Sequence, residues 1–185
     1  MKNLGKKELK VIDLFCGIGG LSHGLIKEGL DVVAGIDNDN SCKYGYEYNN
    51  KAKFIHKDIL QVSAKEINKL FGAKKETIRV LVGCAPCQPF SRLNLKQITT
   101  QQLEPIGKFA NLIKETLPDI VSMENVSGLA DMKKYPIFKT FIDTLKESGY
   151  AGVLAVESDH HKDHQDEDAL VAQSIAYLKN LLKKI

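Results

Sequence analysis

The feature that most constrains the fold is a strand, a glycine loop and a helix in direct succession near the N-terminus. Residues 10–15 read Lys-Val-Ile-Asp-Leu-Phe, an apolar run typical of a short strand, and Cys-Gly-Ile-Gly-Gly follows at residues 16–20. Leu21 and Leu25 then recur at helical spacing. This order begins a dinucleotide-type βαβ unit, because glycine lets a ligand approach the backbone and the helix N-terminus offers free N–H donors.

A second apolar run, residues 31–36, is typical of the next strand and ends at Asp37. This carboxylate stands about 20 residues after the glycine loop, where an acidic side chain meets the hydroxyls of a ribose. Many βα turns use glycine for backbone geometry alone, so these residues by themselves leave a purely structural role open.

Strand and helix patterns continue to alternate as far as Tyr150, which predicts an α/β fold with a doubly wound, mostly parallel sheet. Ligands of such a sheet bind at the carboxyl ends of its strands. The helix expected at residues 40–50 carries Tyr44, Tyr46 and Tyr48, and this aromatic stripe is expected to pack against the sheet. Residues 92–102 have no apolar period and are expected to form a mobile loop. The other helices are expected at residues 64–71, 109–117 and 138–148, and the other strands at 57–60, 80–82 and 119–123.

The loop at residues 83–91 reads Gly-Cys-Ala-Pro-Cys-Gln-Pro-Phe-Ser and follows an apolar strand. Pro86 and Pro89 fix the backbone on either side of Cys87, so its thiol is held rigidly at a strand end, as a nucleophile must be. A buried, inert thiol in a tight turn is the structural alternative. Cys84 and Cys87 also form a Cys-x-x-Cys pair, which is typical of thiol–disulfide proteins, but Pro89 follows too soon for the helix that such a motif begins.

Length and composition are those of one soluble domain with a real core, since 43% of the 185 residues are hydrophobic. The net charge of +3 permits nucleic-acid binding without arguing for it. Four cysteines in a chain of this size do not form a disulfide framework, which favours reduced thiols. No apolar stretch approaches the roughly 20 residues of a membrane span, and the basic N-terminus lacks a signal-peptide core. We therefore expect a cytoplasmic protein without a membrane partner.

Three strings occur together in one order: Asp-Leu-Phe-Cys-Gly-Ile-Gly-Gly at 13–20, Pro-Cys-Gln at 86–88 and Glu-Asn-Val at 124–126. They resemble the motifs of the DNA cytosine-5 methyltransferases, with a partial fourth match at Asp58, and the resemblance covers about residues 10–150. It implies a Rossmann-like methyltransferase of restriction-modification type that uses S-adenosylmethionine rather than a dinucleotide. The substrate implied is double-stranded DNA with the target cytosine flipped out of the helix.

The resemblance also implies roles for individual residues. Cys87 would attack C6 of cytosine, and Glu124, as a protonated acid, would hold the N3 edge and the exocyclic amine. Arg92 and Lys96 either touch DNA phosphates or belong to a plain solvated loop. Asp58 would contact the adenine amino group, although an aspartate at a strand end is also a common helix cap or turn residue. The cofactor-binding residues implied are Phe15, Gly17, Gly19, Gly20, Asp37, Asn38, Asp58, Ile59 and Pro86.

The resemblance stops after Tyr150, which divides the chain into a partial, C-terminally truncated catalytic domain (1–150) and a divergent tail (151–185). Residues 152–157 can still add a strand, and about 166–184 form an amphipathic helix pattern. A second polypeptide would then supply target recognition and the missing motifs; a non-autonomous cofactor-binding subunit or an inactive fragment of a split enzyme is the alternative. His160, His161 and His164 lack the orderly spacing of metal ligands, so we expect no metal.

Overall fold

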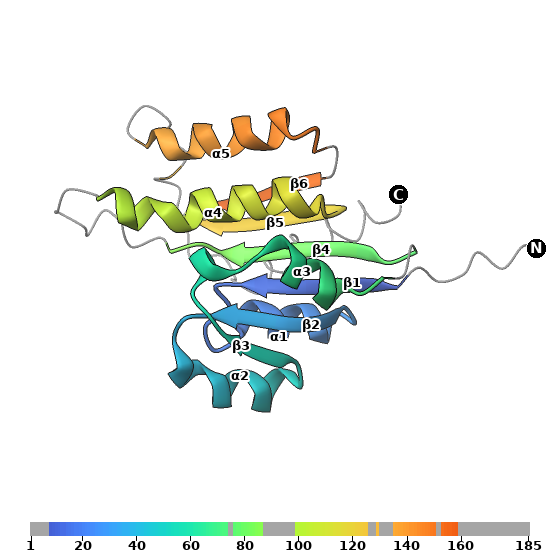
Figure 1. Cartoon of the computed structure of the whole chain (residues 1–185). Helices are drawn as coiled ribbons and strands as arrows, with labels where there is room; N and C mark the ends of the chain where they lie inside the picture. The colour runs from blue at the N-terminus through green and yellow to red at the C-terminus, as the bar shows by residue number, and fades with distance from the viewer. Residues whose placement is uncertain are drawn as a thin grey trace, which may run out of the picture.

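In the part of the chain that the structure describes, six parallel strands form one sheet in the order β3-β2-β1-β4-β5-β6 (Figure 1). The computed structural model describes residues 8–73, 76–86, 99–125, 129, 135–150 and 153–158. All five strand pairings are parallel, and helices connect the successive strands that the structure describes, which confirms the predicted doubly wound α/β fold. The strands are β1 (Leu9–Leu14), β2 (Asp31–Asp37), β3 (Lys53–His56), β4 (Ile78–Cys84), β5 (Ile120–Asn125) and β6 (Val153–Ser158).

The helices cover both faces of the sheet, and each face has its own apolar cluster. In Figure 1, α3 and α4 lie in front of the sheet and α1 lies behind it. Side chains alternate accordingly along β1: Ile12 and Leu14 join the cluster under α3, α4 and α5, whereas Val11 joins the cluster under α1 and α2. The helices are α1 (Gly20–Lys27), α2 (Lys43–Asn50), α3 (Ala64–Phe71), α4 (Thr100–Thr116) and α5 (Pro136–Glu147), with short 3-10 turns η1 (Asn40–Cys42) and η2 (Ile59–Gln61).

Two helices follow from local capping signals. α3 has the bounds that its apolar spacing predicts, because Ser63 and Glu66 form a reciprocal capping box at its start. α4 begins at Thr100, where the Gln102 side chain accepts a hydrogen bond from the Thr99 N–H at 2.9 Å. The predicted mobile loop over residues 92–102 is therefore wrong at its end, while residues 92–98, with Arg92 and Lys96, lie outside the described residues.

The strand predicted at residues 57–60 is also wrong. The strand lies earlier, at Lys53–His56, where buried Phe54 faces the apolar cluster under α2 and the backbone pairs with β2. Asp58 ends the extended run because its carboxylate accepts the Leu60 N–H at 2.9 Å, and this local bond favours a turn over a strand.

The last described strand, β6, pairs with β5 in parallel, which confirms the optional strand at residues 152–157. It adds the first residues of the predicted tail to the sheet, and the division at residue 150 stays a prediction. The histidine cluster and the amphipathic helix pattern lie outside the described residues. Within the described part, no helix is long and apolar enough to cross a membrane.

Candidate functional site

The order of the strands places a crevice between the carboxyl ends of β1 and β4. From β1 the chain moves outward to β2 and β3, and it then returns to pair β4 against the other side of β1. The connections that leave β1 and β4 therefore diverge, which is where ligands bind in open α/β sheets. Phe15 directly follows β1 and Pro86 lies two residues after the end of β4, so each comes from one wall of this crevice.

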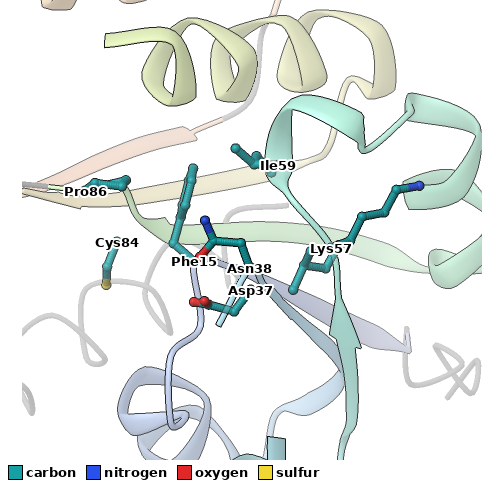
Figure 2. A pocket seen from close by; sticks show the side chains of 8 residues that line it. Phe15, Asp37, Asn38, Lys57, Ile59, Cys84 and Pro86 are labelled. Atoms are coloured by element: carbon teal, nitrogen blue, oxygen red, sulfur yellow. The ribbon is translucent and has the colours of Figure 1, made fainter. Parts of the chain in front are cut away.

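A cavity of about 230 Å³ lies at this point. Figure 2 shows the Phe15 ring between Cys84 and Pro86 on one side and Asp37 and Asn38 on the other. Five of the predicted cofactor residues line the cavity, namely Phe15, Asp37, Asn38, Ile59 and Pro86. The other three lining residues, Ile36, Lys57 and Cys84, are not expected there from the sequence. An apolar strand residue and a turn lysine carry no motif, and Cys84 stands out only as part of a Cys-x-x-Cys pair.

The Asp37 carboxylate is fixed against the glycine loop. Its Oδ2 accepts the Gly17 N–H at 2.8 Å, and its Oδ1 accepts the Asp39 N–H at 2.9 Å. The loop itself reverses sharply, because Phe15, Gly17 and Gly19 all have positive φ, at 59°, 50° and 90°. For Phe15 this conformation carries strain, which is typical of residues held at functional sites.

The glycines of the loop differ in what they allow. A Cβ on Gly19 would lie 2.2 Å from Asn50 Nδ2 and 2.7 Å from the Tyr46 ring, so only glycine fits there. A Cβ on Gly20, the first residue of α1, would meet no atom within 4 Å. None of Gly17, Gly19 and Gly20 is among the side chains that line the cavity, and their contact with a cofactor, through the backbone, stays a prediction.

Asp58 lies at the turn before η2 and is not among the lining residues, although its neighbours Lys57 and Ile59 are. Its carboxylate caps η2, as the structural alternative for this residue predicts. The Lys57 side chain points away from the cavity in Figure 2 and pairs with Glu66 at 2.5 Å. This bond and the Ser63 N–H and hydroxyl lower the pKa of Glu66 to about 2.

The ends of β4 and β5 bring the second catalytic candidate to the same edge. Glu124, half-buried at the end of β5, pairs in register with Cys84. Asn125 Nδ2 donates to the Ala85 carbonyl oxygen at 2.9 Å, and both residues are buried, so the two strand ends are held together. Cys87, three residues after Cys84, lies outside the described residues.

The other described cysteines are not suited to nucleophilic attack. Burial strongly raises the pKa of the Cys16 thiol, and the nearby Asp13 and Asp37 carboxylates raise it further. Burial and Asp39 likewise raise the pKa of Cys42. Both thiols therefore stay protonated at neutral pH, and the thiolate is the reactive form.

Comparison with known proteins gives consistent matches. The family model for the C-5 cytosine-specific DNA methylase matches residues 9–157. The type II methylase M.HgiDII of Herpetosiphon aurantiacus is 49% identical over 140 residues, which make up 76% of this chain and 39% of that protein. The type II methyltransferase M.XorII of Xanthomonas oryzae pv. oryzae is 31% identical over 140 residues, or 75% of this chain and 33% of that protein.

Solved structures give the same result. An E. coli protein described as a DNA modification methyltransferase encoded within a prophage has a TM-score of 0.62 at 27% identity, over 75% of this chain and 38% of that one. The S. pombe Dnmt2 methyltransferase, at a TM-score of 0.58 and 24% identity, shares the fold over 75% of this chain and 42% of that one. The part of the two type II enzymes that this chain matches is 39% of M.HgiDII and 33% of M.XorII, so the chain spans well under half the length of either.

Proposed function

The chain belongs to the family of C-5 cytosine-specific DNA methylases, and we propose on this basis that it forms the cofactor-binding and catalytic part of a DNA cytosine-5 methyltransferase. The reaction is transfer of a methyl group from S-adenosylmethionine to C5 of cytosine in double-stranded DNA. The type II methylases among the relatives support a role in a restriction-modification system. The observation that carries the proposal is the cavity at the β1–β4 crevice, whose lining residue Pro86 is followed directly by Cys87 in the chain.

The residues of this cavity fit S-adenosylmethionine. The Asp37 carboxylate offers acceptors for ribose hydroxyls, and the Phe15 ring and the Ile59 and Pro86 side chains offer apolar surface for an adenine. The cavity of about 230 Å³ is somewhat smaller than the ~300–1,000 Å³ of typical ligand pockets. We propose that further residues wall the bound cofactor, and that Gly17, Gly19 and Gly20 meet it through the backbone. Asn38 and Asp58 are proposed to contact the adenosine part.

The chemistry of this chain centres on Cys87 and Glu124. Cytosine C5 is a weak nucleophile, so Cys87 first adds as a thiolate to C6, which makes C5 electron-rich. Glu124 donates its proton at N3 and so neutralises the charge that develops on the ring. S-adenosylmethionine, when bound, supplies a methyl group on a positively charged sulfur. Loss of the C5 proton to solvent and return of the N3 proton to Glu124 then accompany elimination of Cys87.

The remaining part of the active enzyme is proposed to be a second polypeptide that supplies target recognition. The chain spans 39% of the length of its 49% identical relative, and target recognition is proposed to lie in the part of that relative which the chain does not match. Cytosine inside a stacked duplex is out of reach of Cys87, so the complex flips the base out, at an energy of a few kcal/mol. The proposed partners are therefore double-stranded DNA and this polypeptide.

Calorimetric titration of the chain with S-adenosylmethionine and with NAD tests the cofactor assignment. We expect S-adenosylmethionine to bind weakly and NAD not at all, and binding of NAD alone contradicts a methyltransferase. Chemistry is tested with duplex DNA that contains 5-fluorocytosine, which cannot lose its C5 substituent as a proton and so traps the enzyme. We expect a covalent adduct only with the complementary polypeptide present, lost in Cys87→Ser and retained in Cys84→Ser. An adduct that survives Cys87→Ser removes the proposed nucleophile, and loss in Cys84→Ser favours the thiol–disulfide alternative.

A further inference from the structure

Three buried polar side chains form a hydrogen-bonded network behind the glycine loop, on the face of the sheet covered by α1 and α2. Asp13 of β1, Ser22 of α1 and Tyr46 of α2 are each at most 1% exposed. Ser22 Oγ donates to Asp13 Oδ2 at 2.7 Å and lies 2.9 Å from Tyr46 Oη. A buried polar group costs folding energy unless it is paired, so three such groups in an apolar layer point to a function.

The direction of these hydrogen bonds follows from counting protons. Ser22 has one hydroxyl proton, and the bond to Asp13 uses it, so Tyr46 donates the second bond to Ser22. Donation therefore runs from Tyr46 through Ser22 to the Asp13 carboxyl group. A hydrogen bond to an ionised acceptor is shorter and roughly twice as strong as a neutral one. The hydrogen bonds that join Tyr46, Ser22 and Asp13 are therefore stronger when Asp13 is charged.

The Tyr46 ring connects these hydrogen bonds to the cofactor site, because it packs against both the glycine loop and β2. A Cβ on Gly19 would lie 2.7 Å from Tyr46 Cδ2, and a Cβ on Gly35 would lie 2.4 Å from Tyr46 Cζ. The ring thus fits between the glycine loop and β2, two residues before Asp37. It determines the spacing between the loop and the strand end that bears Asp37, and the Gly17 N–H spans that same gap to the Asp37 carboxylate.

The surroundings of Asp13 bring its pKa into the neutral pH range. Burial raises the pKa of Asp13 to about 7, with a smaller contribution from the Asp37 carboxylate, while the Ser22 hydrogen bond opposes the shift. The other titratable groups that interact with it are the Cys16 thiol in the loop and the Tyr46 hydroxyl on α2, both of which stay neutral. Its in-register neighbours on β2 and β4, Gly35 and Val82, carry no charge.

We propose that Tyr46, Ser22 and Asp13 position the glycine loop for the cofactor, and that the charge on Asp13 determines how firmly they do so. This inference rests on the proposed function, because it concerns the same S-adenosylmethionine pocket. Ionised Asp13 holds the loop and Asp37 in the binding geometry, and neutral Asp13 loosens them. Affinity for S-adenosylmethionine therefore rises between pH 6 and pH 8.

The test is calorimetric titration with S-adenosylmethionine at pH 6, 7 and 8. The wild-type affinity should rise by up to about tenfold between pH 6 and pH 8, the ratio of the ionised fractions for a pKa of about 7. Asp13→Asn, which keeps the shape and has no charge, should hold one affinity across this range. Tyr46→Phe, which keeps the ring, should lose about fivefold in affinity at pH 8 and less at pH 6. Tyr44→Phe is the matched control, since that tyrosine lies on the same helix and is 78% exposed.

The outcomes separate the two levels of inference. Absence of S-adenosylmethionine binding by the wild type at every pH overturns the proposed function and this inference with it. Binding whose pH dependence is the same in the wild type and in Asp13→Asn overturns the positioning network and leaves the proposed function standing. This comparison decides the question even if Tyr46→Phe does not fold. A loss of affinity in Tyr44→Phe equal to that in Tyr46→Phe also overturns it, because the effect then belongs to α2 as a whole.

Discussion

Replacing Asp13 with asparagine should remove a pH dependence of folding stability that the wild type shows between pH 4 and pH 8. Asp13 is 1% exposed, and burial raises its pKa from 3.8 to about 7. A raised pKa means that the folded protein binds this proton more tightly than the unfolded chain does. The stabilisation is therefore fully present below about pH 4, declines as the pH rises, and is lost above about pH 7.

The magnitude follows from the size of the shift. A difference of about three pH units, at ~1.4 kcal/mol for each unit, corresponds to about 4 kcal/mol of unfolding free energy. Integration of proton binding over pH puts more than half of this loss between pH 5 and pH 8. That is a large share of the roughly 5–15 kcal/mol that holds a typical domain folded.

Urea unfolding followed by circular dichroism at pH 5 and pH 8 measures this difference. Other groups titrate in the same range, so the quantity to compare is the change in the wild type minus the change in Asp13→Asn. Asp39→Asn is the matched control, because that exposed carboxylate has a lowered pKa from its bonds to Ser41 and stays ionised above pH 5. A pH dependence in Asp13→Asn equal to that of the wild type would refute a titrating buried carboxyl group.

Much of the fold could be predicted because several local signals agree. The alternation of strand and helix patterns predicts the parallel sheet, and Ser63 and Glu66 fix the start of α3. The failures have local causes. Pro105 lies inside α4 and lacks the N–H of a helix interior, so the pattern before it resembles a loop. β3 has only four residues, too few for a clear alternation against the polar turn that follows.

The three tyrosines of α2 show that the spacing of aromatic residues in a sequence does not determine which of them are buried. Tyr46 packs under the sheet as expected, but Tyr44 and Tyr48 are 78% and 62% exposed and stack on each other, so the expectation is wrong for these two. Residues four apart share a helix face, whereas a residue midway between them points to the opposite side. The spacing therefore permits either Tyr46 or the outer pair in the core, and the contact of Tyr46 with Gly19 and Gly35 determines which.

The site is less predictable than the fold because it joins residues distant in sequence. Phe15, Asp37 and Pro86 come to one cavity through the strand order, whereas the alternation of elements predicts only a parallel sheet with its ligands at the strand ends. The pairing of Ser22 with Tyr46 has no signal in the sequence, since it depends on how α1 and α2 pack. Asp13 does have a signal in the sequence, because an acid inside an apolar strand must find a buried partner.

Two further substitutions address the packing around the pocket. Gly35→Ala should lower the unfolding free energy by about 1–3 kcal/mol, because the new Cβ would lie 2.4 Å from the buried Tyr46 ring. Gly24→Ala is the control, because it lies in α1 with no atom within 4 Å of the new Cβ; it should raise the unfolding free energy by about 0.5–1 kcal/mol. Equal urea midpoints for the two variants would show that the Tyr46 ring moves aside without cost. Asn125→Ala should lower stability by about 1–3 kcal/mol, because it leaves the buried Ala85 carbonyl without the amide that now donates to it at 2.9 Å. Asn125→Asp has the same shape, but an ionised carboxylate cannot donate a proton and repels that carbonyl, so the loss should be at least as large at pH 8. Full stability of Asn125→Asp at that pH would mean that the two strand ends do not depend on this hydrogen bond.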